Sequence, residues 1–306
     1  MVWDIGDGSG HFLHSKEGAT QGDPLAIITY GIGVLPLIRE LQGAHPCITQ
    51  PWYADDTGAR GKFEHILAHL WDKQARGLSR SYCPEPTKSI LVVAPRNVAR
   101  EEELFQGIGI QVVTGHRYLG EFKGDGEAEK RWLADKITRW AESVETLAGV
   151  SRKHPQSAYA GLQKSLQKEW AFVQWITLGI GDAFSPVEKA LRETLVPDLF
   201  EGLGASAPDR VVTHLTFKQA GLALPDPTQT APENWTASCV ITGHLVAALS
   251  GQVEFRTSDH LACLREGRTA VWRRSQQRAE EALAATLEGP PVQHARQLRQ
   301  AKNTGA

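Results

Sequence analysis

Two neighbouring carboxylates near the start of the chain are its strongest candidates for chemistry. Asp55 and Asp56 close the sequence Tyr53-Ala54-Asp55-Asp56, after a run from Ile48 that is rich in β-branched and aromatic residues and predicts a strand. Adjacent carboxylates repel each other and are costly to bury, so a cation is the usual reason to place them there, and a metal ion is the simplest one. The alternative is that the pair caps a following helix.

Three further segments with residues suited to nucleotide contacts lie in order around this pair, about thirty residues apart. They are Gln21-Gly22-Asp23-Pro24, Pro86-Thr87-Lys88 and Tyr118-Leu119-Gly120. The first is a glycine-containing turn that opens a helix, where backbone and side-chain amides can approach a nucleotide closely. Each segment alone is weak evidence, because Gln21 can simply cap a turn and Lys88 can simply be solvated. The shared order is far more specific than any single segment.

Taken together, the four segments resemble motifs B, C, D and E of reverse transcriptases, and most closely those of non-LTR retroelements. The resemblance covers residues 15 to 124. It implies an RNA-directed DNA polymerase that works on an RNA template, a DNA primer and deoxynucleoside triphosphates. The helical remainder of the chain fits a thumb by its position only.

The resemblance also implies a role for each matched residue. Asp55 would ligate a divalent metal and Asp56 would support it, with two Mg²⁺ ions about 4 Å apart in the complete enzyme. Gln21, Gly22 and Tyr53 would bind the incoming nucleotide and template, and Lys88 would neutralise or protonate the departing phosphate. The primer grip would consist of Tyr118, Leu119 and Gly120.

One part of the family pattern has no match in these 306 residues. Reverse transcriptases carry another metal-binding aspartate in motif A, on a strand well upstream of motif B, and they carry a fingers subdomain. Asp4 and Asp7 lie too close to motif B to be motif A. We therefore expect a reverse-transcriptase fragment that is inactive by itself and that pairs with an upstream fingers and motif A segment of the same element. The alternative is a non-catalytic RNA- or DNA-binding remnant of a retroelement.

The expected fold class is α+β. Residues 1–124 would form a partial polymerase palm, an antiparallel sheet with helices; residues 125–230 would form a mostly α-helical thumb-like region; residues 231–306 would form a C-terminal helical region with a frayed tail. Within the palm, a hairpin is expected around Gly6 to His14, and short strands at 107–114 and 117–122. Residues 48–53 and 89–94 should lie in one sheet, with Asp55 at a turn on its edge.

Apolar residues at helical spacing predict the main helices and their buried faces. A helix from Pro24 to Leu41 should pack against the sheet through Leu25, Ile28, Ile32, Leu35 and Ile38. A second should begin near Phe63. In the thumb-like region the expected stripes are Leu133, Ile137, Trp140, Val144 and Leu147, and then Leu162, Leu166, Trp170 and Val173. A loop-rich stretch from Gly221 to Glu233 should precede a last helical block at 235–287.

Composition limits the remaining possibilities. The net charge of -2 excludes a bulk polycation, but residues 1–60 hold three basic and seven acidic residues whereas residues 256–306 hold nine basic and five acidic. An acidic metal site beside a basic phosphate-binding surface would show this split, as would ordinary solvated charge. Four scattered cysteines predict reduced thiols in an intracellular protein. The longest uncharged apolar run, Pro24 to Ile38, is too short to span a membrane.

Two further patterns favour structural interpretations. His65 and His69 have the i, i+4 spacing of some metal ligands, but no third ligand is evident, so a helix face is expected. The nine tryptophans could stack on bases. Because several of them, Trp140 and Trp170 among them, lie within or beside apolar helical stripes, core packing is the better interpretation.

Overall fold

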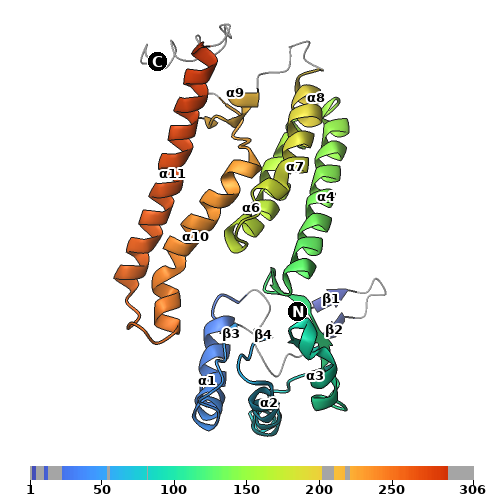
Figure 1. The fold of residues 1–306 in the computed structure, drawn as a ribbon, viewed down its shortest axis with the longest axis vertical. Helices are drawn as coiled ribbons and strands as arrows, with labels where there is room; N and C mark the ends of the chain where they lie inside the picture. The colour runs from blue at the N-terminus through green and yellow to red at the C-terminus, as the bar shows by residue number, and fades with distance from the viewer. Residues whose placement is uncertain are drawn as a thin grey trace. The chain divides into compact units, whose positions relative to one another are not determined.

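The computed structural model describes residues 2–4, 10–12, 23–53, 56–80, 82–201, 210–217 and 221–288. The chain divides into two compact units, Met1–Thr114 and Gly115–Ala306. Figure 1 shows short strands among helices in the first unit and long helices in the second. The α+β class is confirmed. The segment with Tyr118, which was expected in the first domain, belongs to the helical unit.

The first unit alternates short strands with helices. In chain order its elements are β1 (Val2–Asp4), β2 (Gly10–Phe12), α1 (Ala26–Ala44), β3 (Trp52–Tyr53), β4 (Asp56–Thr57), α2 (Phe63–Leu78), the 3-10 turn η1 (Pro86–Lys88), β5 (Ile90–Val92), the 3-10 turn η2 (Pro95–Asn97), α3 (Val98–Leu104) and β6 (Gln111–Val113). Strands β1 and β2 pair antiparallel, which confirms the expected hairpin at the start of the chain.

The strands of the first unit pair only in twos among the described residues. β3 pairs antiparallel with β4, whereas β5 pairs parallel with β6, with Ile90 opposite Gln111. The expectation that 48–53 and 89–94 lie in one sheet is therefore wrong for the described chain. The reason is local: β4 follows β3 directly and takes its edge, whereas η2 and α3 form a crossover that brings β6 back parallel to β5.

Helix α1 buries a different face from the one its spacing predicts. The expected stripe is largely solvent-exposed, with Leu25 62%, Ile28 59%, Ile32 69% and Leu35 39% exposed. The buried residues are Val34, Leu37 and Leu41, which pack with Ile38, Trp52 and Tyr82. Among the described residues, the buried apolar packing of α1 thus runs from Val34 onward. The predicted stripe is wrong because the first half is apolar on all sides, so its spacing selects no face.

A second small core of the first unit lies beneath β5 and β6. Leu91, Val93 and Phe105 are buried, and Phe63, Ile66 and other half-buried residues pack around them. This confirms the amphipathic helix expected from Phe63 onward. The side chain of Glu101 is fully buried, yet neither carboxylate oxygen has a hydrogen-bond partner among the described residues.

The second unit begins with a hairpin and continues as helices. Its elements are β7 (Gly115–Tyr118), β8 (Glu121–Gly124), α4 (Gly126–Ser151), α5 (Pro155–Gly161), the π-helical segment η3 (Leu162–Leu166), α6 (Gln167–Ile176), the 3-10 turn η4 (Asp182–Phe184), α7 (Ser185–Ala190), the π-helical segment η5 (Leu191–Leu195), α8 (Val196–Glu201), α9 (Arg210–His214), α10 (Pro227–Leu249) and α11 (Thr257–Glu288). The segment expected as one strand at 117–122 is instead a hairpin that turns at Leu119 and Gly120, because both residues adopt positive φ angles.

The core of the second unit is built on the expected apolar stripes. On α4, Leu133, Ile137, Trp140 and Val144 are at most 6% exposed. The Trp140 ring stacks on Phe184 at 5.9 Å and its Nε1 donates a hydrogen bond to Glu169. Leu162, Trp170 and Val173 are buried beside it, while Leu147 and Leu166 are half-buried. The core interpretation of Trp140 and Trp170 is confirmed.

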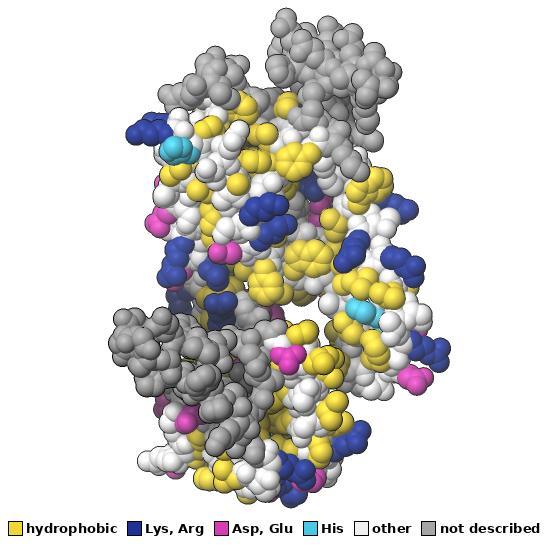
Figure 2. Space-filling view, turned by 180° about the vertical axis from the view of Figure 1, so that it is seen from behind, with side chains coloured by type: hydrophobic (Ala, Val, Ile, Leu, Met, Phe, Trp, Pro, Cys, Tyr) yellow, Lys and Arg dark blue, Asp and Glu magenta, His cyan; other side chains and the backbone are white. Residues whose placement is uncertain are grey.

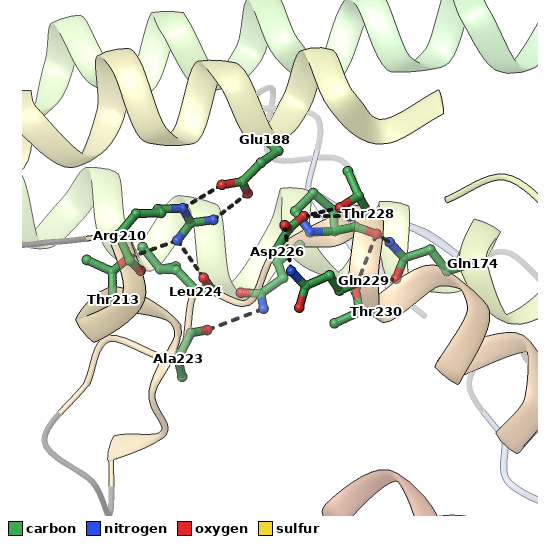
Figure 3. Close-up of polar contacts among 12 residues, drawn as sticks. Gln174, Glu188, Arg210, Thr213, Ala223, Leu224, Asp226, Thr228, Gln229 and Thr230 are labelled. Carbon is green, nitrogen blue, oxygen red and sulfur yellow. Dashed lines mark hydrogen bonds and ion pairs between the residues drawn. The ribbon is translucent and has the colours of Figure 1, made fainter. Parts of the chain in front are cut away.

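Polar contacts fix α9 and α10 to this core (Figure 3). The guanidinium of Arg210 donates two hydrogen bonds to the Glu188 carboxylate and one to the carbonyl oxygen of Leu224. Asp226 accepts from the backbone N–H of Thr228, and Pro227 occupies the first turn, so α10 begins six residues before the end of the expected loop. Burial raises the pKa of Glu188 although Arg210 opposes that shift.

Candidate functional site

Strands β3 and β4 form the hairpin that carries the Tyr-x-Asp-Asp segment. Trp52 lies opposite Thr57, and Tyr53 lies opposite Asp56. The pairing extends down the hairpin through a bridge between Thr49 and Arg60. Tyr53 is 66% exposed and Asp56 is also exposed. Asp55, the expected metal ligand, lies outside the described residues; in sequence it falls between the two paired positions.

A half-buried lysine that the sequence did not single out supports this hairpin. The Nζ of Lys73, on α2, donates a hydrogen bond to the Thr57 hydroxyl at 3.1 Å, and the Tyr82 hydroxyl lies 3.4 Å from the same oxygen. Burial lowers the pKa of Lys73. Trp52 packs against the Tyr82 ring at 5.4 Å. The hairpin therefore rests on α2 and on the segment after it.

The structure contradicts the helix-capping alternative for Asp56. The residue after the hairpin tip belongs to a strand, and the next helix, α2, begins only at Phe63. The N-cap residue of α2 is Lys62, with no capping hydrogen bond from a side chain. Asp56 therefore stands at the start of a return strand and caps no helix.

The motif B segment is described only in part. Gln21 and Gly22 lie outside the described residues. Asp23 and Pro24 form a turn in which the Asp23 carboxylate accepts a hydrogen bond from the backbone N–H of Leu25 at 2.8 Å. Helix α1 follows from Ala26, so the expected turn into a helix is present on the described side.

Lys88 lies in a tight turn immediately before a strand, as the motif D resemblance expects. Pro86 opens the 3-10 turn η1, and β5 begins two residues after Lys88. The Lys88 side chain is exposed. Within the described residues, no hydrogen bond or ion pair joins it to Asp56. Asp56 lies on β4, which pairs with β3, whereas Lys88 precedes β5, which pairs with β6 in a separate sheet.

The expected primer-grip residues form the tip of the β7–β8 hairpin in the second unit. Tyr118 pairs with Glu121, so Leu119 and Gly120 are the two turn residues, with φ of 48° and 89°. Positive φ at both positions is the geometry of a type I′ turn, which is costly for Leu119 and free for Gly120. A Cβ at Gly120 would lie 2.6 Å from the ring of Phe172 on α6, so the turn rests directly on that helix.

The histidine pair on α2 does not form a metal site. His65 is exposed, whereas His69 is 2% exposed and its Nε2 lies 3.2 Å from the amide oxygen of Gln50. Burial lowers the pKa of His69 from 6.5 to about 4, so the ring is neutral at physiological pH. The two rings thus lie in different environments, the His69 ring buried and the His65 ring exposed, as expected for two positions on an ordinary helix surface.

The described residues offer few ligands for the magnesium ions that the resemblance implies. In that part of the chain, no group of three His, Cys, Asp or Glu side chains could hold a metal ion. Asp56 offers a single exposed carboxylate. The described residues alone therefore do not make a magnesium site, and a second carboxylate from outside them is required.

A basic and aromatic surface surrounds the β7–β8 hairpin; we call Arg117, Leu119, Lys136, Arg139 and Phe172 the hairpin surface. The Nζ of Lys136 lies 5.5 Å from the Trp132 ring and 5.3 Å from the Trp140 ring. Burial lowers the pKa of Lys136, and the charge of Arg117 lowers it further. Leu119 and Phe172 are 46% and 47% exposed. The sequence signal for this surface is the i, i+4 spacing of Trp132, Lys136 and Trp140.

Comparison of the chain with protein-family models, with curated proteins and with solved structures finds no match. No helix in the described part of the chain combines the length and apolar character that a membrane crossing requires. Its four cysteines, Cys47, Cys83, Cys239 and Cys263, are free thiols, as their spacing predicts.

Proposed function

We propose that this chain is the motif B to E portion of a reverse-transcriptase-like nucleotidyltransferase, which does not polymerise by itself. The observation that carries the proposal is the β3–β4 hairpin, which presents Tyr53 and Asp56 side by side and exposed at its tip. A hairpin tip at the end of a strand is where a Tyr-x-Asp-Asp segment must stand if its carboxylates are to reach a metal and a primer end.

Three features support this assignment beside the hairpin. Lys88 is exposed and forms no side-chain hydrogen bond or ion pair with the described residues, so its charge is available to a phosphate. The Tyr118 segment forms a second hairpin tip. Asp56 lies on β4 and does not cap the following helix, α2. The four segments thus keep both their order in the chain and turn or strand-end positions.

In the proposed complete enzyme, Mg²⁺ would activate the primer 3′ hydroxyl and stabilise the leaving pyrophosphate. The residues of this chain have more limited tasks. Tyr53 would line the nucleotide site beside Gln21 and Gly22, and Lys88 would place a positive charge near the nucleotide phosphates. The Asp56 carboxylate would contribute charge, and the carboxylate that the described residues lack would come from a motif A strand.

Primer extension on an RNA template tests the proposal. The purified 306-residue chain should extend no primer with magnesium and nucleotides. A fusion to the fingers and motif A segment of a related reverse transcriptase should restore extension. Robust extension by the isolated chain would show that the chain supplies its own missing ligand. Failure of every fusion that folds and binds template would contradict the polymerase assignment.

The second candidate is a non-catalytic RNA- or DNA-binding remnant of a retroelement. The hairpin surface favours it, because Arg117, Lys136 and Arg139 gather positive charge beside two exposed apolar side chains. Under this alternative, a duplex of template and primer should bind the isolated chain. Arg117→Gln with Arg139→Gln should weaken binding and reduce its salt dependence by about one unit of slope per lost phosphate contact. A short distance from Asp4 or Asp7 to Asp55 would favour the enzyme and a long one the binding remnant. The side chains of Asp4, Asp7 and Asp55 lie outside the described part of the structure.

A further inference from the structure

Helix α11 carries an exposed stripe that none of the four motifs uses. Leu261, Arg265, Arg268 and Trp272 follow one another at spacings of four, three and four residues. These spacings place the four side chains within about 60° of one another around the helix. All four are exposed, and Trp272 is 61% exposed. We call these four residues the α11 stripe.

The packing of α11 against α10 turns this stripe away from the rest of the unit. Gly267 is buried, and a Cβ there would lie 2.4 Å from the Ile241 side chain and 3.2 Å from the carbonyl oxygen of Ala237. Gly267 lies on the side of α11 roughly opposite to Arg265 and Trp272. Figure 1 shows α10 between α11 and α6, which agrees with the extensive contacts of α10 on both sides. The rotation of α11 is therefore fixed with the stripe outward.

The charges on the stripe are positive and available. Neither Arg265 nor Arg268 forms an ion pair within the described residues, and the Nε of Arg265 donates a hydrogen bond to the Leu261 carbonyl oxygen. The nearby carboxylates of Asp259 and Glu266 lie about 100° or more away around the helix. Figure 2 shows Lys and Arg side chains beside hydrophobic ones along this edge of the second unit.

A polyanion with exposed aromatic faces complements this surface better than other partners do. Planar guanidinium groups match phosphate oxygens, and an indole ring in line with them offers a stacking platform for a base. An acidic peptide would satisfy the arginines but would leave the Trp272 ring in water. A duplex keeps its base faces stacked inside, so it would use the arginines alone.

We propose that the α11 stripe binds single-stranded nucleic acid, with Arg265 and Arg268 on successive phosphates and Trp272 stacked on a base. The inference goes beyond the polymerase proposal and does not depend on it, because no motif residue takes part. It assigns a function to the basic C-terminal part of the chain, where solvated charge was the alternative.

Fluorescence anisotropy of a short labelled oligouridine with the full chain tests the proposal. Trp272→Ala should weaken binding about tenfold, since stacking accounts for that much per base. Arg265→Gln with Arg268→Gln should lower the slope of log K against log salt by about 1.4, the value for two phosphate contacts to a single strand. Circular dichroism of each variant should match the unchanged chain.

Matched controls come from the first unit. Trp71 on α2 is 54% exposed, so Trp71→Ala removes a comparably exposed indole. Arg60→Gln with Arg96→Gln removes the same charge from two exposed arginines. Both controls should bind oligouridine as the unchanged chain does.

Three outcomes would overturn the proposal. The first is equal binding by the unchanged chain and by both stripe variants. The second is an equal loss in the controls, which would show that net charge alone decides affinity. The third is competition by polyglutamate that is as strong as that by unlabelled oligouridine, with no effect of Trp272→Ala; this would assign the stripe to an acidic protein partner.

Discussion

Helices α1 and α4 both carry apolar residues at regular helical spacing, yet only α4 buries the stripe that its spacing predicts. Leu133, Ile137, Trp140 and Val144 of α4 are at most 6% exposed, whereas Ile28 and Ile32 of α1 are 59% and 69% exposed. In α4, charged residues occupy the other faces and single out one stripe. Residues 24–38, which include most of α1, contain no charge at all. Periodicity identifies a buried face only where the remaining faces differ from it.

Buried charged groups are treated differently in two places of the structure. In the second unit, Arg210 and Glu188 are 10% and 13% exposed and satisfy each other. In the first unit, the carboxylate of Glu101 is fully buried without a hydrogen-bond partner among the described residues, and the Arg100 Nε lies 3.7 Å from its Oε1. The second unit also holds buried polar atoms without a hydrogen-bond partner among the described residues, Thr177 Oγ1 and His214 Nε2 among them. The polar groups therefore do not separate the two units, and the exposed apolar face of α1 is the feature that fits the proposal of a larger palm.

The largest stability effect should come from breaking the buried ion pair of the second unit. Arg210→Met leaves the Glu188 carboxylate buried without its partner, which should lower the free energy of unfolding by about 3–5 kcal/mol. Arg192 forms an exposed pair with Glu193, so Arg192→Met should cost within about 1 kcal/mol. Urea unfolding measures both. Equal costs would contradict the view that the Arg210 cluster anchors α9.

A smaller effect depends on pH and reports on the first unit. The pKa of His69 is lowered from 6.5 to about 4 by burial, so the unfolded chain binds this proton more readily than the folded chain does. Stability from neutral His69 is thus complete above pH 6.5 and is lost as the pH falls towards about 4, by up to about 3 kcal/mol.

The matched variants are His69→Gln and His65→Gln on the same helix. The amide of His69→Gln can still meet Gln50, and this variant should lose much of the decline in stability between pH 6.5 and 4. His65 is exposed, so His65→Gln should keep the full decline. Urea unfolding at several pH values measures the free energy of unfolding of each variant. If stability declined with falling pH in His69→Gln as it does in the unchanged chain, burial of the His69 ring could not be its cause.

The smallest effect should come from the exposed half of α1. Ile27 and Ile32 are 71% and 69% exposed, so Ile27→Ser or Ile32→Ser should change the free energy of unfolding by no more than about 0.5 kcal/mol. Leu37→Ala, at a fully buried position of the same helix, should cost about 2–5 kcal/mol. A comparable cost for Ile32→Ser would mean that this face is covered in the folded chain.

Much of the second unit could be predicted from its residues. The helix expected around the stripe from Leu162 to Val173 occurs as one continuous helical segment from Pro155 to Ile176, although its π-helical turn at 162–166 has no clear sequence signal. The early start of α10 was missed because three prolines suggested a loop. Pro227 in fact stands in the first turn behind the Asp226 cap.

Less of the candidate site could be predicted. The Asp-Asp segment was expected at the end of a strand, and β3 does end at Tyr53. The support from Lys73 could not be foreseen, because it depends on how α2 packs against the hairpin. Lys73 lies 16 residues after its partner Thr57 and belongs to no recognisable motif. The division into separate two-stranded sheets could not be predicted either, because apolar runs identify strands but do not show which strands pair.

The central claim is that Asp55 carries its charge for phosphoryl transfer, and one measurement tests it most directly. In the fusion that restores primer extension, Asp55→Asn should abolish synthesis, because it removes a ligand charge while keeping the side-chain volume. Asp259→Asn, a like change on the exposed surface of α11, should leave synthesis intact. Synthesis by Asp55→Asn at the rate of the unchanged fusion would contradict the polymerase assignment.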